Sequence, residues 1–208
     1  YLNCDYPNLI LCDIICHANP SPKVFKRYIK ALELKAASKV KSYTFRSKFN
    51  GWDNLVPIVE YENGKTDNET TFITAFLRGI IHRPCCYECK FTKPFNFADI
   101  TLGDFWGVDK LTDIRQYKDG TSLILINTKK GENFFKDVTG LKLYKIQDTI
   151  DVFKYNHKKP DKPHRNRAKF FKKLDYIKDE DAIDYINKIG INNEPKVYLL
   201  ILLEQLVK

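Results

Sequence analysis

The sequence predicts an α/β or α+β fold, with a mixed β-sheet flanked by helices and a helical C-terminal end. Two nearly continuous apolar runs, Asn8–Cys16 and Thr121–Thr128, are typical of strands buried in a sheet. Between and after these runs, apolar residues recur at helical spacing, first in the segment that follows Ser21. With 208 residues and 43% apolar side chains, the chain is long enough to bury a sizeable core.

The first half of the chain predicts a strand, a helix, two further strands and a second helix. The first helix begins at Ser21-Pro22, a capping residue followed by a proline suited to the first turn. Lys39–Lys48 and Leu55–Tyr61 predict strands. The Asn-Gly pair within residues 62–65 predicts a hairpin with a type I′ turn. Thr70–Ile81 follows as a helix that leads into a cysteine-rich loop.

The second half of the chain continues with short elements of both kinds. Asp119-Gly120 marks a turn before the second apolar run, and a helix carries Phe134-Phe135. Leu141–Ile146 predicts a last strand. Residues 158–163 combine proline with charge and predict a loop, after which the chain is helical. The apolar stretch Leu199–Leu203 predicts a buried helix face.

The net charge of +9 is unevenly distributed along the chain. Between Asp151 and Lys173 there are nine Lys or Arg residues against two Asp, so this segment carries most of the excess. A solvated basic loop that leads into a basic helix is the plainest interpretation. A site for a phosphate-bearing cofactor or an acidic partner protein is the second. Nucleic acid is the weakest, because no aromatic platform accompanies the charge.

Composition also indicates where in the cell the protein is expected. No apolar run approaches the roughly 20 residues that a membrane-spanning helix needs, and no signal peptide is visible. Six cysteines in a lysine-rich chain without an export signal favour free thiols or metal ligands over disulfides, and therefore a cytoplasmic protein. The chain begins at Tyr1 and contains no Met, so we expect further residues of the protein upstream.

The strongest chemical signal is the pair Cys86-x-x-Cys89, because two intervening residues let both sulfurs face one ion or cluster. An iron–sulfur ligand pair is one interpretation. A zinc site completed by His82, Cys85 and His17 is another. A redox dithiol is a third, although the residues after the pair do not begin a helix well. Free thiols without a role are the fourth.

Two further segments place polar residues beside strand ends and glycines. Cys16 ends the first apolar run, where ligands collect in α/β domains, whereas Cys12 lies within it and predicts a core residue. Asp99, Gly103 and Asp104 belong to a glycine-containing turn that either packs an aromatic side chain or lines a ligand site. No Ser-His-Asp order, P-loop or Gly-x-Gly-x-x-Gly pattern appears, so no catalytic residue is predicted.

Four segments together resemble a known family. Asp13–Pro22 is similar to its D-x-x-C-H-G-x-P-S-P motif and Arg83–Phe91 to R-P-S-C-Y-x-C-K-F. Ala98–Gly107 is similar to S-D-I-T-L-G-D-F-W-G, and Gly120–Gly131 to G-x-S-L-x-L-x-N-T-x-x-G. The family is the coenzyme F420 hydrogenase/dehydrogenase beta subunit group, specifically its C-terminal domain, in the bacterial sub-type that accompanies polysaccharide biosynthesis. The resemblance covers roughly residues 8–135, in the family's order.

The resemblance implies an iron–sulfur flavoprotein oxidoreductase with a [4Fe–4S] cluster and FAD. Such a protein passes electrons between the cluster, the flavin and a ferredoxin-like partner or a deazaflavin acceptor. It implies that Cys16, Cys86 and Cys89 are cluster ligands. A fourth ligand is expected upstream of the chain, with Cys85 as the nearest substitute. The residues that it implies near the flavin are Asp99, Gly103, Asp104, Gly120 and Ser122.

The resemblance also implies a division of the chain. Residues 1–155 would form the iron–sulfur and flavin domain, and residues 156–208 a basic loop and helical extension packed on it. The alternative is a zinc-stabilised binding or scaffold domain without redox activity.

Overall fold

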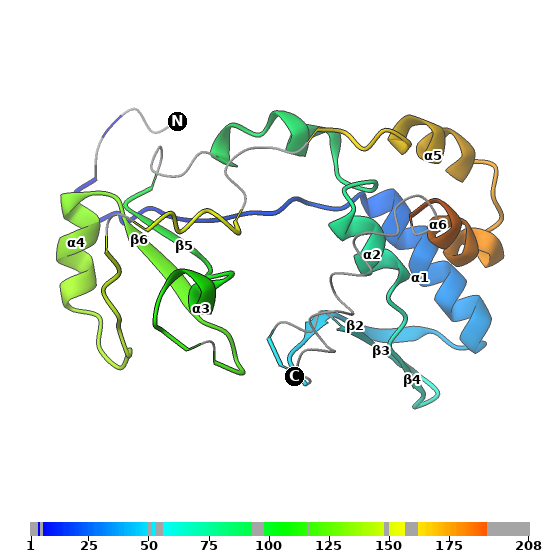
Figure 1. The fold of residues 1–208 in the computed structure, drawn as a ribbon. Helices are drawn as coiled ribbons and strands as arrows, with labels where there is room; N and C mark the ends of the chain where they lie inside the picture. The colour runs from blue at the N-terminus through cyan, green and yellow to red at the C-terminus, as the bar shows by residue number, and fades with distance from the viewer. Residues whose placement is uncertain are drawn as a thin grey trace. The chain divides into compact units, whose positions relative to one another are not determined.

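The structure is a computed structural model, and it divides into two compact units. Unit 1 consists of Tyr1–His17 with Glu88–Pro160, and unit 2 of Ala18–Tyr87 with Asp161–Lys208. The described residues are 4, 6–49, 51–52, 56–92, 98–115, 117–147, 150–156 and 162–190. They form two three-stranded sheets and six α-helices (Figure 1), which confirms the predicted mixed α/β class and its helical C-terminal end.

Unit 1 is built on a sheet with the strand order β1-β5-β6. Its strands are β1 (Cys12–Ile14), β5 (Ile100–Asp104) and β6 (Ser122–Ile126). β5 is central, parallel to β1 and antiparallel to β6.

The predicted burial of the two apolar runs is wrong for much of their length. Ile14 is 67% exposed, Cys12 is also exposed, and in β6 only Leu123 is buried. Among the described strands, β1 and β6 each pair on one side only. An apolar run does not distinguish such an edge strand from a central one.

Helical elements and a small core complete the described part of unit 1. The elements are the 3₁₀ turn Lys90–Thr92, α3 (Val108–Leu111) and α4 (Lys129–Lys136). The core gathers around Phe105, which is 1% exposed.

The strand predicted for Leu141–Ile146 is wrong. These residues pair with no strand in the described part of the chain. Leu141 and Leu143 are more than half exposed, and Ile146 packs against the small core around Phe105. The apolar pattern therefore does not mark a strand, and within this segment Ile146 contacts the core.

The sheet of unit 2 is an antiparallel meander of β2 (Val40–Ser47), β3 (Val56–Tyr61) and β4 (Thr66–Asp67), as the sequence predicted for the first two. The predicted type I′ turn is wrong, because Asn63 does not have the positive φ that this turn requires. Gly64 alone has it, at 80°, and its amide donates to the Tyr61 carbonyl at 3.0 Å. The Asn63 side chain instead accepts from the Lys65 amide at 3.1 Å, which fixes the turn locally.

The helices of unit 2 come from both ends of the chain. They are α1 (Pro22–Ala36), α2 (Thr71–Leu77), α5 (Arg167–Leu174) and α6 (Ala182–Gly190), with 3₁₀ turns at Pro84–Glu88 and Asp179–Asp181. α1 begins with Pro22 as predicted, although the Ser21 side chain makes no capping hydrogen bond. α2 ends before the predicted Ile81, because Gly79 takes a φ of 72°.

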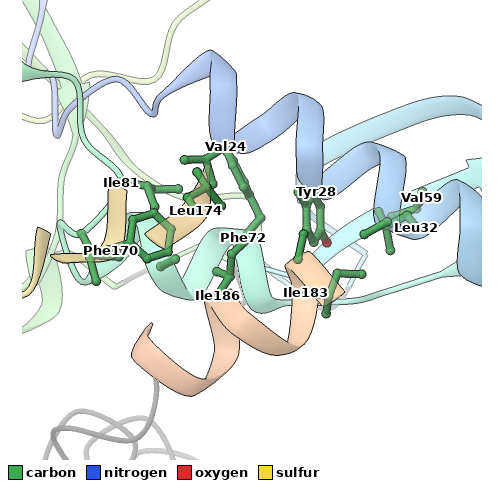
Figure 2. Close-up of a cluster of buried hydrophobic side chains, with 14 of the residues drawn as sticks. Val24, Tyr28, Leu32, Val59, Phe72, Ile81, Phe170, Leu174, Ile183 and Ile186 are labelled. Atoms are coloured by element: carbon green, nitrogen blue, oxygen red, sulfur yellow. The ribbon is translucent and has the colours of Figure 1, made fainter. Parts of the chain in front are cut away.

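One core joins these distant segments (Figure 2). Val24 and Tyr28 of α1 meet Phe72 of α2, Phe170 of α5 and Ile186 of α6, and each of the five is at most 1% exposed. Full burial of such side chains is what stabilises a small domain. The C-terminal helices are therefore part of the same core as the N-terminal ones. The boundary predicted between residues 155 and 156 stays a prediction.

Two predictions fall outside the described residues. The loop predicted at residues 158–163 does so for its greater part, and the apolar stretch Leu199–Leu203 does so entirely. Of the helices that the structure describes, none is long and apolar enough to cross a membrane.

Candidate functional site

The first group of predicted site residues lies at one edge of the unit 1 sheet. β1 and β5 run parallel with Ile14 opposite Leu102, and the Ile15 amide donates to the Leu102 carbonyl at 2.8 Å. Parallel strands end at the same edge of a sheet, where ligands collect in α/β proteins. Cys16 is the next residue along the chain, and it is exposed at this edge.

Gly103 lets the segment that carries Cys16 pass close to β5. A Cβ atom at this position would lie 2.7 Å from Cδ1 and 3.2 Å from Cβ of Ile15. Non-bonded carbon atoms are optimally about 3.5–4.0 Å apart. A larger residue at position 103 would therefore require the Ile15 side chain to turn aside and the neighbouring backbone to give way by a few tenths of an ångström.

Asp104, Gly120 and Ser122 lie at the same edge. Asp104 pairs with Ser122 in the antiparallel register, and the Asn156 side chain donates to the Asp104 carbonyl at 3.1 Å. Gly120 turns the chain toward β6 with a φ of 93°, which favours glycine. The structure thus gathers four of the five residues predicted for the flavin near the segment that carries Cys16.

Asp99, the fifth, lies at the other end of β5. At the usual rise of a strand, it is about 17 Å from Asp104. Its side chain is buried, and its carboxylate accepts from the Leu11 amide at 3.0 Å and from the Thr128 hydroxyl at 2.5 Å. The Lys130 ammonium lies 3.8 Å from the same carboxylate. The Leu11 hydrogen bond, followed by these other contacts, holds the pKa of Asp99 below its ordinary value. The carboxylate therefore fixes the start of β1 to the start of α4.

Thr128 and Gly131 complete this contact. The Thr128 hydroxyl accepts from the Gly131 amide at 3.1 Å and so caps α4. Gly131 lies against the Asp99 backbone, where a Cβ atom would be 2.4 Å from the carbonyl oxygen. Only a residue without a side chain fits there.

Cys86 lies in unit 2, in the 3₁₀ turn Pro84–Glu88. Its amide donates to the Arg83 carbonyl at 3.0 Å, and the Asn19 amide donates to its sulfur at 3.2 Å. Hydrogen bonds to cysteine sulfur are among the interactions that set the potential of an iron–sulfur cluster. The surroundings of Cys86 therefore fit a thiolate ligand of such a cluster.

The other predicted ligands lie in unit 1. Cys89 is half-buried, and its carbonyl accepts from the Thr92 hydroxyl at 3.0 Å. All six cysteines of the chain are free thiols. Within the described ranges, no three His, Cys, Asp or Glu side chains lie close enough together to hold a metal ion. A joint ligand set of Cys16, Cys86 and Cys89 therefore stays a prediction.

His82, considered as a zinc ligand, is a core residue of unit 2. It is 1% exposed, and its Nε2 lies 2.8 Å from the Phe76 carbonyl oxygen. Its ring packs against Phe76 and Tyr87, with centroid distances of 5.1 and 6.2 Å. The chain itself thus engages one ring nitrogen of His82 and packs two aromatic rings against it.

Sequence reasoning missed Arg167, which lies within the basic segment. Its guanidinium donates to the His82 carbonyl through Nε at 3.2 Å and Nη2 at 2.9 Å. The guanidinium also lies over the rings of Tyr87 and Phe171. The charge run gives no signal of this contact, because its partner lies 85 residues earlier in the chain.

A surface cavity of about 500 Å³ lies along α5 and α6. Its lining includes Lys169, Lys173, Tyr185, Lys188 and Ile189. None of the predicted ligand or flavin residues lines it, so this hollow and the predicted chemistry do not coincide.

A match to a known family defines the class of protein. Residues 5–151, more than half of the chain, match the family model for the C terminus of the coenzyme F420 hydrogenase/dehydrogenase beta subunit. This is a family of oxidoreductase subunits that act within larger complexes, so the class carries a redox role.

The chain belongs to this family, whose members typically bind iron–sulfur clusters and FAD. No curated protein and no solved structure matches the chain.

Proposed function

We propose that the chain is an iron–sulfur flavoprotein subunit that passes electrons between a [4Fe–4S] cluster, FAD and a partner protein or deazaflavin acceptor. Membership of the family supports the redox role. One observation carries the proposal to a particular residue: the Asn19 amide donates to the Cys86 sulfur at 3.2 Å. A backbone donor directed at sulfur suits a thiolate ligand.

In this proposal the thiolates of Cys16, Cys86 and Cys89 hold the cluster, and Cys85 is the nearest further thiol in the chain. Soft thiolate ligands suit iron–sulfur clusters, whereas carboxylates suit harder ions. When bound, the cluster supplies one-electron transfer, and the flavin supplies exchange between one-electron and two-electron chemistry. The protein's own part is to hold the sulfurs, donate hydrogen bonds to them and limit the access of water.

The proposed flavin site is the sheet edge formed by Gly103, Asp104, Gly120 and Ser122. Gly120 permits a flat cofactor to approach the backbone, whereas the space beside Gly103 is filled by Ile15. The Ser122 hydroxyl is a hydrogen-bond donor at the same edge. The proposed part of Asp99 is different. By fixing Leu11 at the start of β1, it sets the position of the strand that leads to the cysteine at this edge.

The partner in this proposal is an acidic electron-transfer protein that meets the basic segment Asp151–Lys173. Clustered positive charge accelerates the encounter with such a partner and makes it dependent on salt. We include in the proposal the bacterial sub-type associated with polysaccharide biosynthesis, which the four sequence motifs resemble.

The test of the metal ligands is anaerobic purification with iron and sulfide, followed by iron analysis and visible absorption. We expect a brown protein, and we expect Cys16→Ser, Cys86→Ser and Cys89→Ser each to lower the iron content. Cys12→Ser is the matched control, because Cys12 is an exposed thiol in β1 outside the proposed set. A colourless protein with stoichiometric zinc would instead support the alternative of a zinc-stabilised scaffold.

The test of the flavin site is FAD binding by Asp104→Ala, with the exposed Asp109→Ala as control. Loss of polar contacts to a bound cofactor typically weakens binding about tenfold for each 1.4 kcal/mol. We expect Asp104→Ala to bind FAD more weakly and Asp109→Ala to bind it as the unaltered chain does. Equal affinities for both variants and the unaltered chain would contradict the assignment of the sheet edge.

A further inference from the structure

We propose that Arg167 is a positioning residue for the cysteine turn, defined as His82–Tyr87: its guanidinium fixes the backbone that carries Cys86. Arg167 lies outside residues 5–151, the part of the chain that matches the family. The inference rests on the proposed function only for the identity of what Cys86 binds, because the contacts themselves belong to the chain.

The guanidinium holds the turn in two ways. Its Nε and Nη2 both donate to the His82 carbonyl oxygen, at 3.2 and 2.9 Å. Its carbon lies 5.5 Å from the ring centroid of Tyr87 and 4.4 Å from that of Phe171. A planar guanidinium can stack on a ring while two of its N–H groups donate in a fixed geometry, whereas a lysine ammonium is a compact point charge without this geometry. Arg167 thus fixes the turn at both ends, at His82 and at Tyr87.

The far side of the same backbone holds the hydrogen-bond donor for Cys86. The Ser21 amide donates to the Ile81 carbonyl at 2.7 Å, and the Arg83 amide donates to the Asn19 carbonyl at 2.9 Å. These bonds pair the chain around His82 with the residues before α1. The Asn19 amide then donates to the Cys86 sulfur. Displacing the His82 carbonyl therefore disturbs the amide that is directed at the sulfur.

The helix that carries Arg167 is itself firmly held. Arg167 is the first residue of α5, and Phe170 and Leu174 of the same helix are 0% exposed in the core of unit 2. Side chains locked in a close-packed core move little. α5 is therefore a rigid support for the turn, and the segment after residue 161 completes the surroundings of Cys86.

The experiment compares Arg167→Gln with Arg165→Gln in the full metal-free chain. Arg165 has the same charge, lies two residues earlier and is exposed. The readout is the rate at which iodoacetamide modifies Cys86 at fixed pH, followed by peptide mass spectrometry and normalised to the exposed Cys4. Loss of a hydrogen-bonded, stacked charge opens the turn, so we expect about tenfold faster modification of Cys86 in Arg167→Gln. We expect no change in Arg165→Gln.

Two further variants separate positioning from general stability. Ile186→Ala removes a fully buried side chain far along the chain from the turn, and it should lower global stability without changing the Cys86 rate. Arg167→Lys keeps the charge but loses the planar guanidinium. It should therefore not restore the slow modification of Cys86 seen in the unaltered chain. Equal rates in Arg167→Gln and Arg165→Gln would overturn the proposal, and so would an equal increase in Ile186→Ala.

The same variants, loaded with iron and sulfide, give a second readout. The visible circular dichroism of the bound cluster should change in Arg167→Gln and stay unchanged in Arg165→Gln. If the unaltered chain binds no iron, the proposed function fails, whereas the alkylation rates of the metal-free chain still decide the role of Arg167.

Discussion

Replacing Gly131 by alanine places two known effects in opposition. Gly131 lies in the first turn of α4, and alanine is ordinarily better than glycine in a helix by about 1 kcal/mol. Here, however, a Cβ atom would lie 2.4 Å from the carbonyl oxygen of Asp99 and 3.0 Å from its carbonyl carbon. Overpacking of this kind destabilises by about 1–3 kcal/mol. Which effect is larger depends on whether the Asp99 backbone can move aside.

The hydrogen bonds of Asp99 indicate that it does not move easily. Its carbonyl accepts from the Asn127 amide at 2.9 Å, and its amide donates to the Leu11 carbonyl at 2.9 Å. Its carboxylate is bound as well, so a shift would strain several contacts together. We therefore take the overpacking cost to be about 3 kcal/mol, from which the gain in helix propensity of about 1 kcal/mol is subtracted. We expect Gly131→Ala to lower the free energy of unfolding of unit 1 by about 2 kcal/mol.

The assay is urea unfolding followed by the fluorescence of Trp106, in a Trp52→Phe background because the chain has two tryptophans. The midpoint and slope of the transition give the free energy. Asn133→Ala is the control, since this residue is exposed in the same helix and should gain only a few tenths of a kcal/mol from alanine. A Gly131→Ala protein at least as stable as the unaltered chain would refute the close approach to Asp99.

Two further predictions test the polar contact of unit 1 and the core of unit 2. Because the pKa of Asp99 is lowered in the fold, its ionised carboxylate stabilises the protein above the ordinary carboxyl pKa, and this stabilisation disappears as the pH falls through the lowered value. Asp99→Asn should therefore lose most stability near neutral pH and least in acid by urea unfolding, and a pH-independent difference would contradict this. Phe170→Ala should destabilise unit 2 by about 3–5 kcal/mol, read from Trp52 in a Trp106→Phe background. Lys172→Ala, an exposed neighbour, should change stability by less than about 0.5 kcal/mol, and equal effects would exclude α5 from the core.

Local signals in the sequence predicted much of the fold. α1 begins where Ser21-Pro22 indicated, because proline suits the first turn whatever lies around it. The sheet edge was also predictable in part. Cys16 ends an apolar run that predicted a strand, which is β1 in the structure. The central strand β5 was not predicted, because the glycines of residues 99–107 indicated a turn. Residues at the ends of parallel strands meet without any need to know their side-chain contacts.

Features that depend on distant partners were not predictable. The apolar run around Ile14 looks the same whether a strand has one neighbour or two, so its exposure was missed. Asp99 looked like part of a ligand loop, whereas its carboxylate binds Leu11, 88 residues earlier in the chain. The Asn63 turn is a different case, because the contact that replaced the predicted turn type is local, between its side chain and the Lys65 amide. Each miss reflects a contact that the sequence pattern alone does not reveal.

The composition of unit 2 from two separated segments has a consequence for synthesis on the ribosome. The first segment ends at Tyr87, but the core that it contributes to is closed by Phe170 and Ile186. The apolar faces of α1 and α2 must wait for about 100 further residues, or about 5–20 s at ordinary translation rates. During this time they are candidates for chaperone binding. A nascent chain stalled before α5 should therefore be more sensitive to protease in residues 18–87 than one stalled after α6.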